Sequence, residues 1–314
     1  MSNTTMRQWR NILILGAGEL GMAMLKGFMK ERETHPEIQL TVLVRPSSLS
    51  ANASPAQKQR LQQLADWQVE AIAADFSEQT PEELAGIFAH YDAVINCSGF
   101  VGGKGTQLRI TRAVLLAGVK RYFPWQFGVD YDRIGMGSGQ PVWDEQLAVR
   151  QLLRAQQQTQ WVIVSTGMFT SFLFDASFGL VDFSAHTVMA LGDANYAITL
   201  TTPEDIGLLT AALFFHQPLL KNEVVYLSGD TLTWRELAAL LSQHYASPFT
   251  LEVKTRRELK VATEAAPEDT AAAYRLAFAR AEGVAWPKAD TFNARHHFQV
   301  TDVRRWLAEN KPLS

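Results

Sequence analysis

ILILGAGELG (residues 12–21) passes from four branched aliphatic residues directly into a glycine-rich loop. A buried strand, then Gly-x-Gly-x-x-Gly, then a helix is the arrangement that binds the diphosphate of a dinucleotide. In this arrangement Gly16 permits the tight turn, Gly18 lets the diphosphate approach the backbone, and Gly21 lets the helix pack closely on the strand. The free N–H groups of the first helical turn then face the phosphates. The residues of this loop that we predict to bind a cofactor are Gly16, Ala17, Gly18, Glu19, Leu20 and Gly21.

The second predicted strand ends without an acidic residue. Residues 39–46 read QLTVLVRP, so Arg45 stands where NAD-selective sites place an acidic residue that binds the ribose. A guanidinium pairs with the 2′-phosphate of NADP(H), whereas a carboxylate repels it. Ser47, Ser48 and Lys58 are further donors nearby in the sequence. The sequence therefore predicts NADP(H) rather than NAD(H), the alternative being that Arg45 is an ordinary solvated charge.

Short apolar runs alternate with helical patterns through the first half of the chain, as in a parallel sheet with helices on both faces. The predicted strands cover residues 11–15, 39–44, 69–74, 93–96, 121–124 and 161–165. The predicted helices cover residues 19–32, 56–65, 81–89, 106–117 and 143–157. We expect an α/β fold, a doubly wound parallel sheet of the Rossmann type, with a smaller C-terminal α+β domain.

The expected domain boundary lies after the sixth strand. Residues 1–165 are expected to bind NADP(H), and residues 166–314 are expected mostly to bind substrate. Segments near 202–230 are expected to return to the first domain.

The ends of the third and fourth predicted strands add candidate cofactor residues. Asp75 closes the third strand, where its carboxylate can accept a hydrogen bond from the adenine amino group, and Phe76 can cover the ring. A turn or N-cap role for Asp75 is an equal alternative. The glycine-rich run 99–105 lets the chain pass close to the cofactor, and Cys97 is expected to be a small buried residue rather than a reactive thiol. The cofactor residues predicted after the fourth strand are Cys97, Ser98 and Gly99.

The composition limits the class of protein. The 314 residues carry a formal net charge of −3, which indicates no direct binding to nucleic acid. The single cysteine excludes an internal disulfide bond and agrees with a reducing compartment. The polar N-terminus MSNTTMRQWR lacks the apolar core of a secretory signal, and no apolar run is long enough to span a bilayer. We expect a cytoplasmic protein that binds no membrane and, because no ligand spacing indicates one, no metal ion.

Residues 120–133, KRYFPWQFGVDYDR, resemble the NmrA-like and isoflavone reductase-like proteins, atypical members of the short-chain dehydrogenase/reductase superfamily. The family pattern at this point is a basic residue, an aromatic pair, Pro-Ser-Glu-Phe-Gly and an Asp-rich turn. The variant Pro-Trp-Gln-Phe-Gly-Val-Asp is similar to the CipA-like branch. Further matching stretches are residues 42–46, 205–207 and 225–227. The resemblance implies a Rossmann domain with a smaller substrate domain, NADP(H) as cofactor, and reduction of a small aromatic or conjugated substrate.

The resemblance also assigns site residues. It implies that Gln107 and Phe127 contact the cofactor, and that the segment after the sixth strand forms walls of the substrate pocket. Together with Phe172 and Phe174 these walls are aromatic and apolar, which suits a flat ligand but also an ordinary core. The residues predicted to contact substrate are Trp125, Thr166, Gly167, Met168 and Phe169.

Two residues depart from the family pattern. Leu15 replaces a leading glycine, which leaves the three glycines with physical roles in place. Gln146 stands where the reductases of the family have the lysine that is taken as catalytic. A glutamine amide donates and accepts hydrogen bonds but has no usable pKa. The Tyr-x-x-x-Lys pair of the superfamily is absent as well.

Gln146 nevertheless shares an inward helical face with Val142, Val149 and Leu153. A buried amide needs a specific hydrogen-bond partner, which here is substrate, the nicotinamide carboxamide or the backbone. The candidate catalytic residues are Gln146 and, as proton donor, Tyr131, followed by Asp130 or Asp144.

Two functions of different classes remain open. The first is an NADPH-dependent reductase of a small aromatic or conjugated substrate. The second is a non-catalytic NADP(H)-binding redox sensor that regulates a protein partner, which the missing lysine favours. A cofactor-free structural module is a third class. The expected partners are a small-molecule substrate, a protein if the chain is a regulator, and a second copy if it forms a homodimer.

Overall fold

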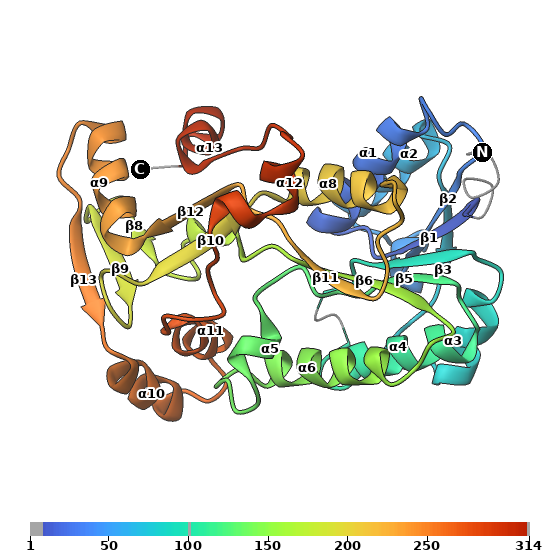
Figure 1. Ribbon diagram of the computed structural model, residues 1–314, viewed down its shortest axis with the longest axis horizontal. Coiled ribbons are helices and arrows are strands. Elements are labelled where there is room, and N and C mark those ends of the chain that lie inside the picture. Colours follow the sequence, from blue (N-terminus) through green and yellow to red (C-terminus); the bar gives the residue numbers. More distant parts are fainter. Residues whose placement is uncertain (1–8, 100–101, 313–314) are drawn as a thin grey trace. The chain divides into compact units, whose positions relative to one another are not determined.

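Seven strands form one sheet, in the spatial order β11 (Glu223–Tyr226), β6 (Gln160–Ser165), β5 (Arg121–Phe123), β4 (Ala93–Asn96), β1 (Asn11–Leu15), β2 (Gln39–Val44) and β3 (Glu70–Ala73) (Figure 1). The pairs that join β3, β2, β1, β4, β5 and β6 are all parallel. The chain builds outward from β1 to β3 and then crosses back to place β4 on the other side of β1. The point between β1 and β4 is therefore the switch point at which such sheets bind ligands.

Helices cover both faces of this sheet, which confirms the predicted α/β class. Figure 1 shows α1, α2 and α8 on one face and α3, α4 and α6 on the other. Their bounds are α1 (Glu19–Glu31), α2 (Pro55–Asp66), α3 (Pro81–Phe88), α4 (Thr106–Leu116), α6 (Pro141–Arg154) and α8 (Pro203–Phe215). A 3-10 turn, Pro46–Ser48, follows β2. Since the sheet is covered twice, Ile12 to Leu15 are all fully buried, as expected for a continuous aliphatic strand.

Each face of the sheet has its own apolar layer. On the face of α3, α4 and α6, residues such as Phe88, Ile110 and Leu153 pack against the strands. On the other face, Phe28 of α1 meets Phe214 of α8 edge to face, with ring centroids 5.3 Å apart. The second of these contacts packs α1 against α8 on its face of the sheet.

The computed structural model describes residues 9–99 and 102–312, and they fall into two units. The first unit comprises residues 1–126, 145–164 and 206–224 of the chain, and the second comprises 127–144, 165–205 and 225–314. Residues 127–144, which were expected in the first domain, group with the second unit. Residues 206–224 group with the first unit and lie within the region 202–230 that was expected to return to it.

The second unit mixes short strands with helices. One sheet has the order β12 (Asp230–Thr233), β10 (Ala197–Thr201), β7 (Met168–Phe169), and another has the order β13 (Thr250–Lys254), β9 (Thr187–Leu191), β8 (Val181–Asp182). Its helices are α5 (Tyr131–Ile134), α7 (Thr170–Leu173), α9 (Trp234–Tyr245), α10 (Arg256–Ala265), α11 (Thr270–Phe278), α12 (Phe292–Arg295) and α13 (Val303–Asn310), with a 3-10 turn at Lys288–Asp290.

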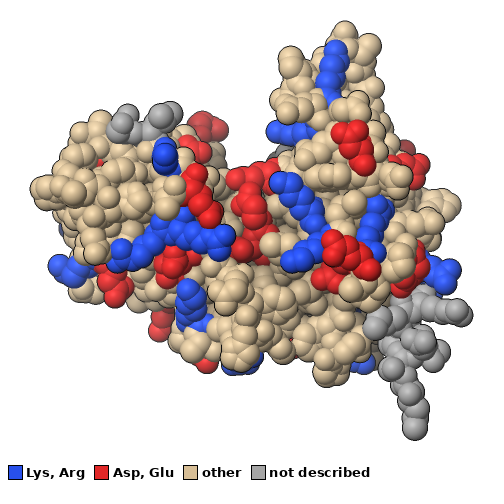
Figure 2. Space-filling model, turned by 90° about the horizontal axis from the view of Figure 1, so that it is seen from above, with Lys and Arg blue, Asp and Glu red and all other residues tan. Residues whose placement is uncertain are grey.

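The charged side chains are mixed in sign over the face that Figure 2 presents, with Lys and Arg next to Asp and Glu. This mixture agrees with the small formal net charge of −3. Across residues 9–99 and 102–312, none of the helices has the length and hydropathy of a bilayer-spanning segment.

Candidate functional site

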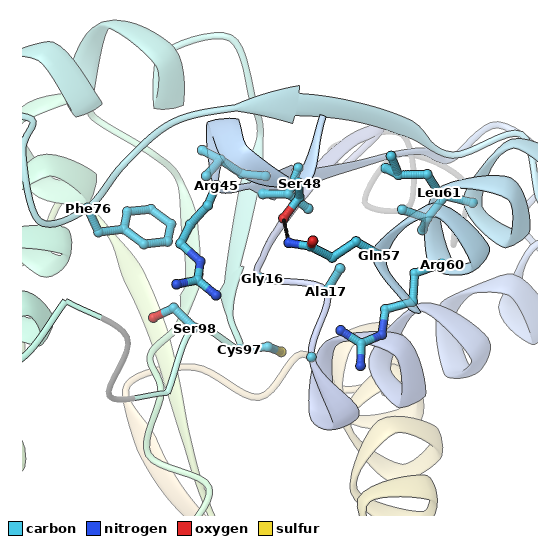
Figure 3. A pocket seen from close by; sticks show the side chains of 14 residues that line it. Gly16, Ala17, Arg45, Ser48, Gln57, Arg60, Leu61, Phe76, Cys97 and Ser98 are labelled. Carbon is cyan, nitrogen blue, oxygen red and sulfur yellow. Dashed lines mark hydrogen bonds between the residues drawn. The ribbon is translucent and has the colours of Figure 1, made fainter. Parts of the chain in front are cut away.

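A cavity of about 170 Å³ lies at the carboxyl ends of β1, β2 and β4, within the first unit (Figure 3). It therefore occupies the switch point of the sheet. The strand ends supply its walls on one side, and α2 supplies them on the other. The predicted cofactor residues that line it are Gly16, Ala17, Gly18, Arg45, Phe76, Cys97 and Ser98.

The three glycines of the loop are required for three different physical reasons. Gly16 has a φ of +94°, which side-chain-bearing residues rarely adopt. A Cβ at Gly21 would stand 2.0 Å from the carbonyl oxygen of Gly16, so helix and loop touch there. Gly18 has an ordinary φ of −77°, and no described atom lies within 4 Å of the place of a Cβ. Neither conformation nor packing explains glycine at position 18, whereas a ligand seated against the loop explains it.

The first turn of α1 is open to an anion. Its N-cap residue is Gly18, which has no side chain. Gly18 therefore accepts no side-chain hydrogen bond from the N–H groups of the first turn. Those N–H groups and the helix dipole favour a negative charge. Glu19 and Leu20 belong to this turn, and because Leu20 is buried it offers a backbone rather than a side-chain group to a ligand here.

The start of α4 differs, because Glu145 of α6 already caps it. The Glu145 carboxylate accepts hydrogen bonds from the backbone N–H groups of Gly105 and Gln107, both at 2.8 Å, and of Leu108 at 3.1 Å. Glu145 is buried. The starts of α2 and α3 are capped by the side chains of Ser54 and Thr80. Among these helices, the start of α1 is therefore the candidate phosphate site.

Two guanidinium groups line the cavity, Arg45 after β2 and Arg60 on α2. In Figure 3 they lie on either side of the Gly16–Ala17 turn, with Phe76 beside Arg45. Ser48 also lines the cavity and accepts a hydrogen bond from Gln57 at 3.1 Å. No Asp or Glu is among the lining residues, all of which are described. The charged side chains that line the cavity are therefore all positive.

Sequence reasoning did not find Arg60 or Gln57 and named Lys58 and Ser47 instead, which do not line the cavity. The helical periodicity of the sequence of α2 could have revealed both residues. The α2 residues that face the cavity are spaced i, i+3, i+4 and i+7: Gln57, Arg60, Leu61 and Leu64.

Asp75 and Phe76 have different surroundings. Phe76 is buried and lines the cavity. The Asp75 carboxylate accepts a hydrogen bond from the backbone N–H of Ser77 at 2.9 Å and another from its hydroxyl, which is the turn role given as the alternative. These bonds lower the pKa of Asp75, and the positive charge of Arg45 lowers it further. Asp75 is not among the lining residues.

A buried amide network shapes the end of β4. The Asn96 side chain donates to Gln107 at 2.8 Å and accepts from the backbone N–H of Ser98 at 3.0 Å. Gln107 in turn donates to the carbonyl oxygen of Gly99 at 2.6 Å. Gln107 thus holds the strand end in place and does not itself line the cavity. Residues 100 and 101 of the predicted glycine-rich run, like the N-terminal residues 1–8, lie outside the described residues.

Cys97 is buried, as expected, and its burial raises the pKa of the thiol above the usual range. The thiol therefore stays protonated at pH 8, where an unfolded cysteine is partly ionised. We expect iodoacetamide to alkylate the native protein at least about tenfold more slowly than the urea-unfolded protein at this pH, since only the thiolate reacts. Mass spectrometry of the single cysteine measures both rates, and equal rates would contradict the burial.

Gln146 is fully buried on α6, as are Val149 and Leu153, whereas Val142, the fourth member of the predicted inward face, is half-buried. Its Oε1 accepts a hydrogen bond of 2.7 Å from Gln126. Its Nε2 has no hydrogen-bond partner among the described residues. Arg150, one turn further along α6, is fully buried too and donates from Nε to Gln126 at 2.9 Å. A buried amide with unused donors is the strongest sign of a ligand in this helix.

Tyr131 is buried in the second unit, where its ring meets Trp143 edge to face with centroids 6.1 Å apart. The two alternative proton donors have structural uses. Asp130 accepts a hydrogen bond of 2.8 Å from the Tyr226 hydroxyl, and Asp144 caps the backbone N–H groups of residues 137 and 138.

The predicted substrate residues are divided between the units. Trp125, half-buried, belongs to the first unit, and the others, with Phe127, belong to the second. Met168 and Phe169 form strand β7, paired with β10, which the aromatic pattern did not reveal. Thr166 is buried and its Oγ1 lacks a partner among the described residues, while Gly167 packs against the backbone of β10. Phe172 is 39% exposed.

Phe174 and the histidines, cysteine and carboxylates of the chain were also considered as site residues. Phe174 is buried and stacks on Trp306, with ring centroids 4.7 Å apart, so it belongs to a core. In the described part of the chain, no group of three or more His, Cys, Asp or Glu side chains is placed to hold a metal ion.

Comparisons with known proteins agree with this geometry. The sequence model of the NmrA-like family matches residues 8–277. An NmrA-like family domain-containing oxidoreductase of Gibberella moniliformis is 42% identical over 300 residues, covering 95% of this chain and 97% of that protein. Among solved structures, an isoflavone reductase has a TM-score of 0.74 at 21% identity, covering 96% of this chain and 99% of its own. AtPrR2 with NADP+ and (+)pinoresinol has a TM-score of 0.74 at 18% identity, covering 96% and 98%.

Proposed function

Because the chain belongs to the NmrA-like family, we propose that it is an oxidoreductase that uses NADPH to reduce a small aromatic or conjugated substrate. One observation carries the proposal: the open start of α1, Arg45 and Arg60 surround one cavity at the switch point of the sheet. The names of the relatives support it, since one is an oxidoreductase and another was solved with NADP+.

The cavity fits the phosphate-bearing half of NADP(H). Its volume of about 170 Å³ is below the ~300–1,000 Å³ of typical small-ligand pockets, so it would hold only part of a dinucleotide. The N–H groups at the start of α1 would hold the diphosphate. Arg45 would pair with the 2′-phosphate and Phe76 would cover the adenine, while Arg60 adds a second positive charge.

The chemistry follows from what the bound group and the chain each supply. The nicotinamide, when bound, supplies the hydride. Gln146 donates an N–H to the substrate oxygen on which negative charge develops. Because an amide does not ionise, the proton that completes the reduction comes from water.

Arg45→Ala is expected to weaken NADPH binding by about 1.5–3 kcal/mol, typical of a lost hydrogen bond between charged groups. This corresponds to roughly 10–150-fold in Kd. NADH, which lacks the 2′-phosphate, should bind with nearly unchanged affinity. Isothermal titration calorimetry of both nucleotides measures the difference.

Lys58→Ala is the matched control for this experiment, because Lys58 lies on the same helix as Arg60 but does not line the cavity. It should leave both affinities unchanged. Equal losses of NADPH and NADH affinity in Arg45→Ala would contradict the assignment to the 2′-phosphate. No heat with either nucleotide in the unmodified protein would end the proposal.

A redox sensor without turnover is the second candidate function, and the amide at position 146 favours it, since it replaces an ionisable group. Purified protein mixed with NADPH and a panel of quinones, enones and phenylpropenyl compounds separates the two. Oxidation of NADPH with any of them supports the reductase. Tight NADPH binding without oxidation supports the sensor.

A further inference from the structure

Three buried side chains of the first unit are hydrogen-bonded in series. Arg150 donates from Nε to Oε1 of Gln126 at 2.9 Å, and Gln126 donates from Nε2 to Oε1 of Gln146 at 2.7 Å. The same Nε2 also donates to the backbone carbonyl of Gln146 at 2.9 Å. All three side chains are fully buried.

The direction of this series is determined by chemistry. A guanidinium only donates, so the Gln126 atom that faces Arg150 must be its oxygen. A backbone carbonyl only accepts, so the Gln126 atom that faces Gln146 must be its nitrogen. Gln126 is therefore oriented by two independent partners. Its Nε2 donates to the Gln146 side chain, so the Gln146 atom that accepts must be the oxygen Oε1.

The Gln146 amide is in consequence held in one orientation. Its oxygen is used by Gln126, and its Nε2 carries two N–H groups that have no acceptor among the described residues. Buried donors without a partner are costly, so they indicate a group that arrives from outside.

We propose that Arg150 and Gln126 are positioning residues that hold Gln146 as a dedicated hydrogen-bond donor. This inference rests on the proposed reductase function and specifies its ligand: Gln146 recognises an acceptor oxygen, such as the carbonyl of a quinone, an enone or a carboxamide. An N–H or ammonium group at that place would meet only donors. Two sources of the oxygen share this chemistry, the substrate carbonyl and the nicotinamide carboxamide.

Gln126→Glu tests the direction of the series. A carboxylate accepts both from Arg150 and from Nε2 of Gln146, so the Gln146 amide turns over and presents its oxygen instead. We expect a loss of at least about thirtyfold, in kcat if the acceptor belongs to the substrate and in NADPH affinity if it belongs to the nicotinamide. Either result supports the series. Values within twofold of the unmodified protein in both measurements overturn it.

Gln146→Glu makes the activity depend on pH in a way that a purely structural role of residue 146 would not. The carboxylic acid still accepts from Gln126, and in its protonated form it donates an O–H where the amide donated N–H. Its kcat relative to the unmodified protein should therefore fall about tenfold per pH unit once the acid ionises. A ratio that stays constant with pH contradicts the donor role.

A thermal-unfolding cycle tests the series without any turnover. In Gln146→Lys an ammonium faces the Nε2 donor of Gln126, so we expect a fall in Tm of at least about 5 °C. Adding Gln126→Glu places a carboxylate between the introduced ammonium and Arg150 and should recover most of that loss. Gln151→Glu, exposed on the same helix, is the control and should leave Tm and kcat unchanged.

The experiments distinguish failure of the hydrogen-bond series from failure of the proposed reductase function. A double variant no more stable than Gln146→Lys overturns the hydrogen-bond direction even if the protein is an active reductase. Recovery of Tm in a protein that oxidises NADPH with no compound of the panel retains the series and removes the reductase function.

Discussion

Gly21→Ala should abolish NADPH binding and lower the free energy of unfolding by about 3 kcal/mol, the upper range for overpacking a tight site. The added methyl group would stand 2.0 Å from the carbonyl oxygen of Gly16 and 2.8 Å from its carbonyl carbon. Both are backbone atoms, so no flexible side chain can move aside. The loop must shift, and the N–H groups at the start of α1 lose their arrangement. Urea unfolding and calorimetry with NADPH measure the two effects.

Gly18→Ala is the matched comparison, three residues earlier in the same loop. Its φ of −77° suits alanine, and no described atom lies near the new methyl group, so stability should change by less than about 0.5 kcal/mol. NADPH affinity should nevertheless fall at least about tenfold, because the methyl group occupies the place of the diphosphate. Unchanged affinity in a stably folded Gly18→Ala would show that the diphosphate lies elsewhere.

Glu145→Ala is expected to cost about 3–5 kcal/mol of stability, which is the second large effect. The substitution removes three charge-assisted hydrogen bonds and leaves the first N–H groups of α4 without an acceptor. Because Gln107 lies in the first turn of this helix and holds the end of β4, we also expect weaker NADPH binding. Urea unfolding measures the first effect and calorimetry the second.

Glu82→Ala, at an exposed carboxylate in the first turn of α3, is the control for Glu145→Ala and should cost less than about 1 kcal/mol. Glu145→Gln should fall between the two, since an amide oxygen accepts but carries no charge. A loss below about 1 kcal/mol in Glu145→Ala would mean that water satisfies the α4 N–H groups.

The parallel sheet was predictable because its signals are local. Each of the six predicted strands lies within one residue of its observed bounds, since buried parallel strands are continuous aliphatic runs. The glycine loop was predictable for the same reason, as strand, loop and helix are contiguous. Arg45 was found because it follows β2 directly.

The missed features depend on residues far apart in the sequence. Glu145 caps a helix that begins nearly forty residues earlier, and Gln126 orients a side chain on another element. To predict Arg60 as a cavity residue, one would have had to work out which face of α2 lies toward the glycine loop. In the second unit, β7 and β8 are two residues long, too short for an alternating pattern to mark them.

The interleaved order of the two units has a consequence for biosynthesis. A ribosome makes residues 1–126 and 145–164 of the first unit before it makes residues 165–205 of the second. The last segment of the first unit, residues 206–224, which includes the start of β11, is made after that. The nascent chain must therefore keep the outer edge of β6 unpaired while residues 165–205 of the second unit are translated. The N-terminal unit cannot mature first, as domains generally do during synthesis. Its last strand arrives only when about seven tenths of the 314 residues have left the peptidyl-transferase centre.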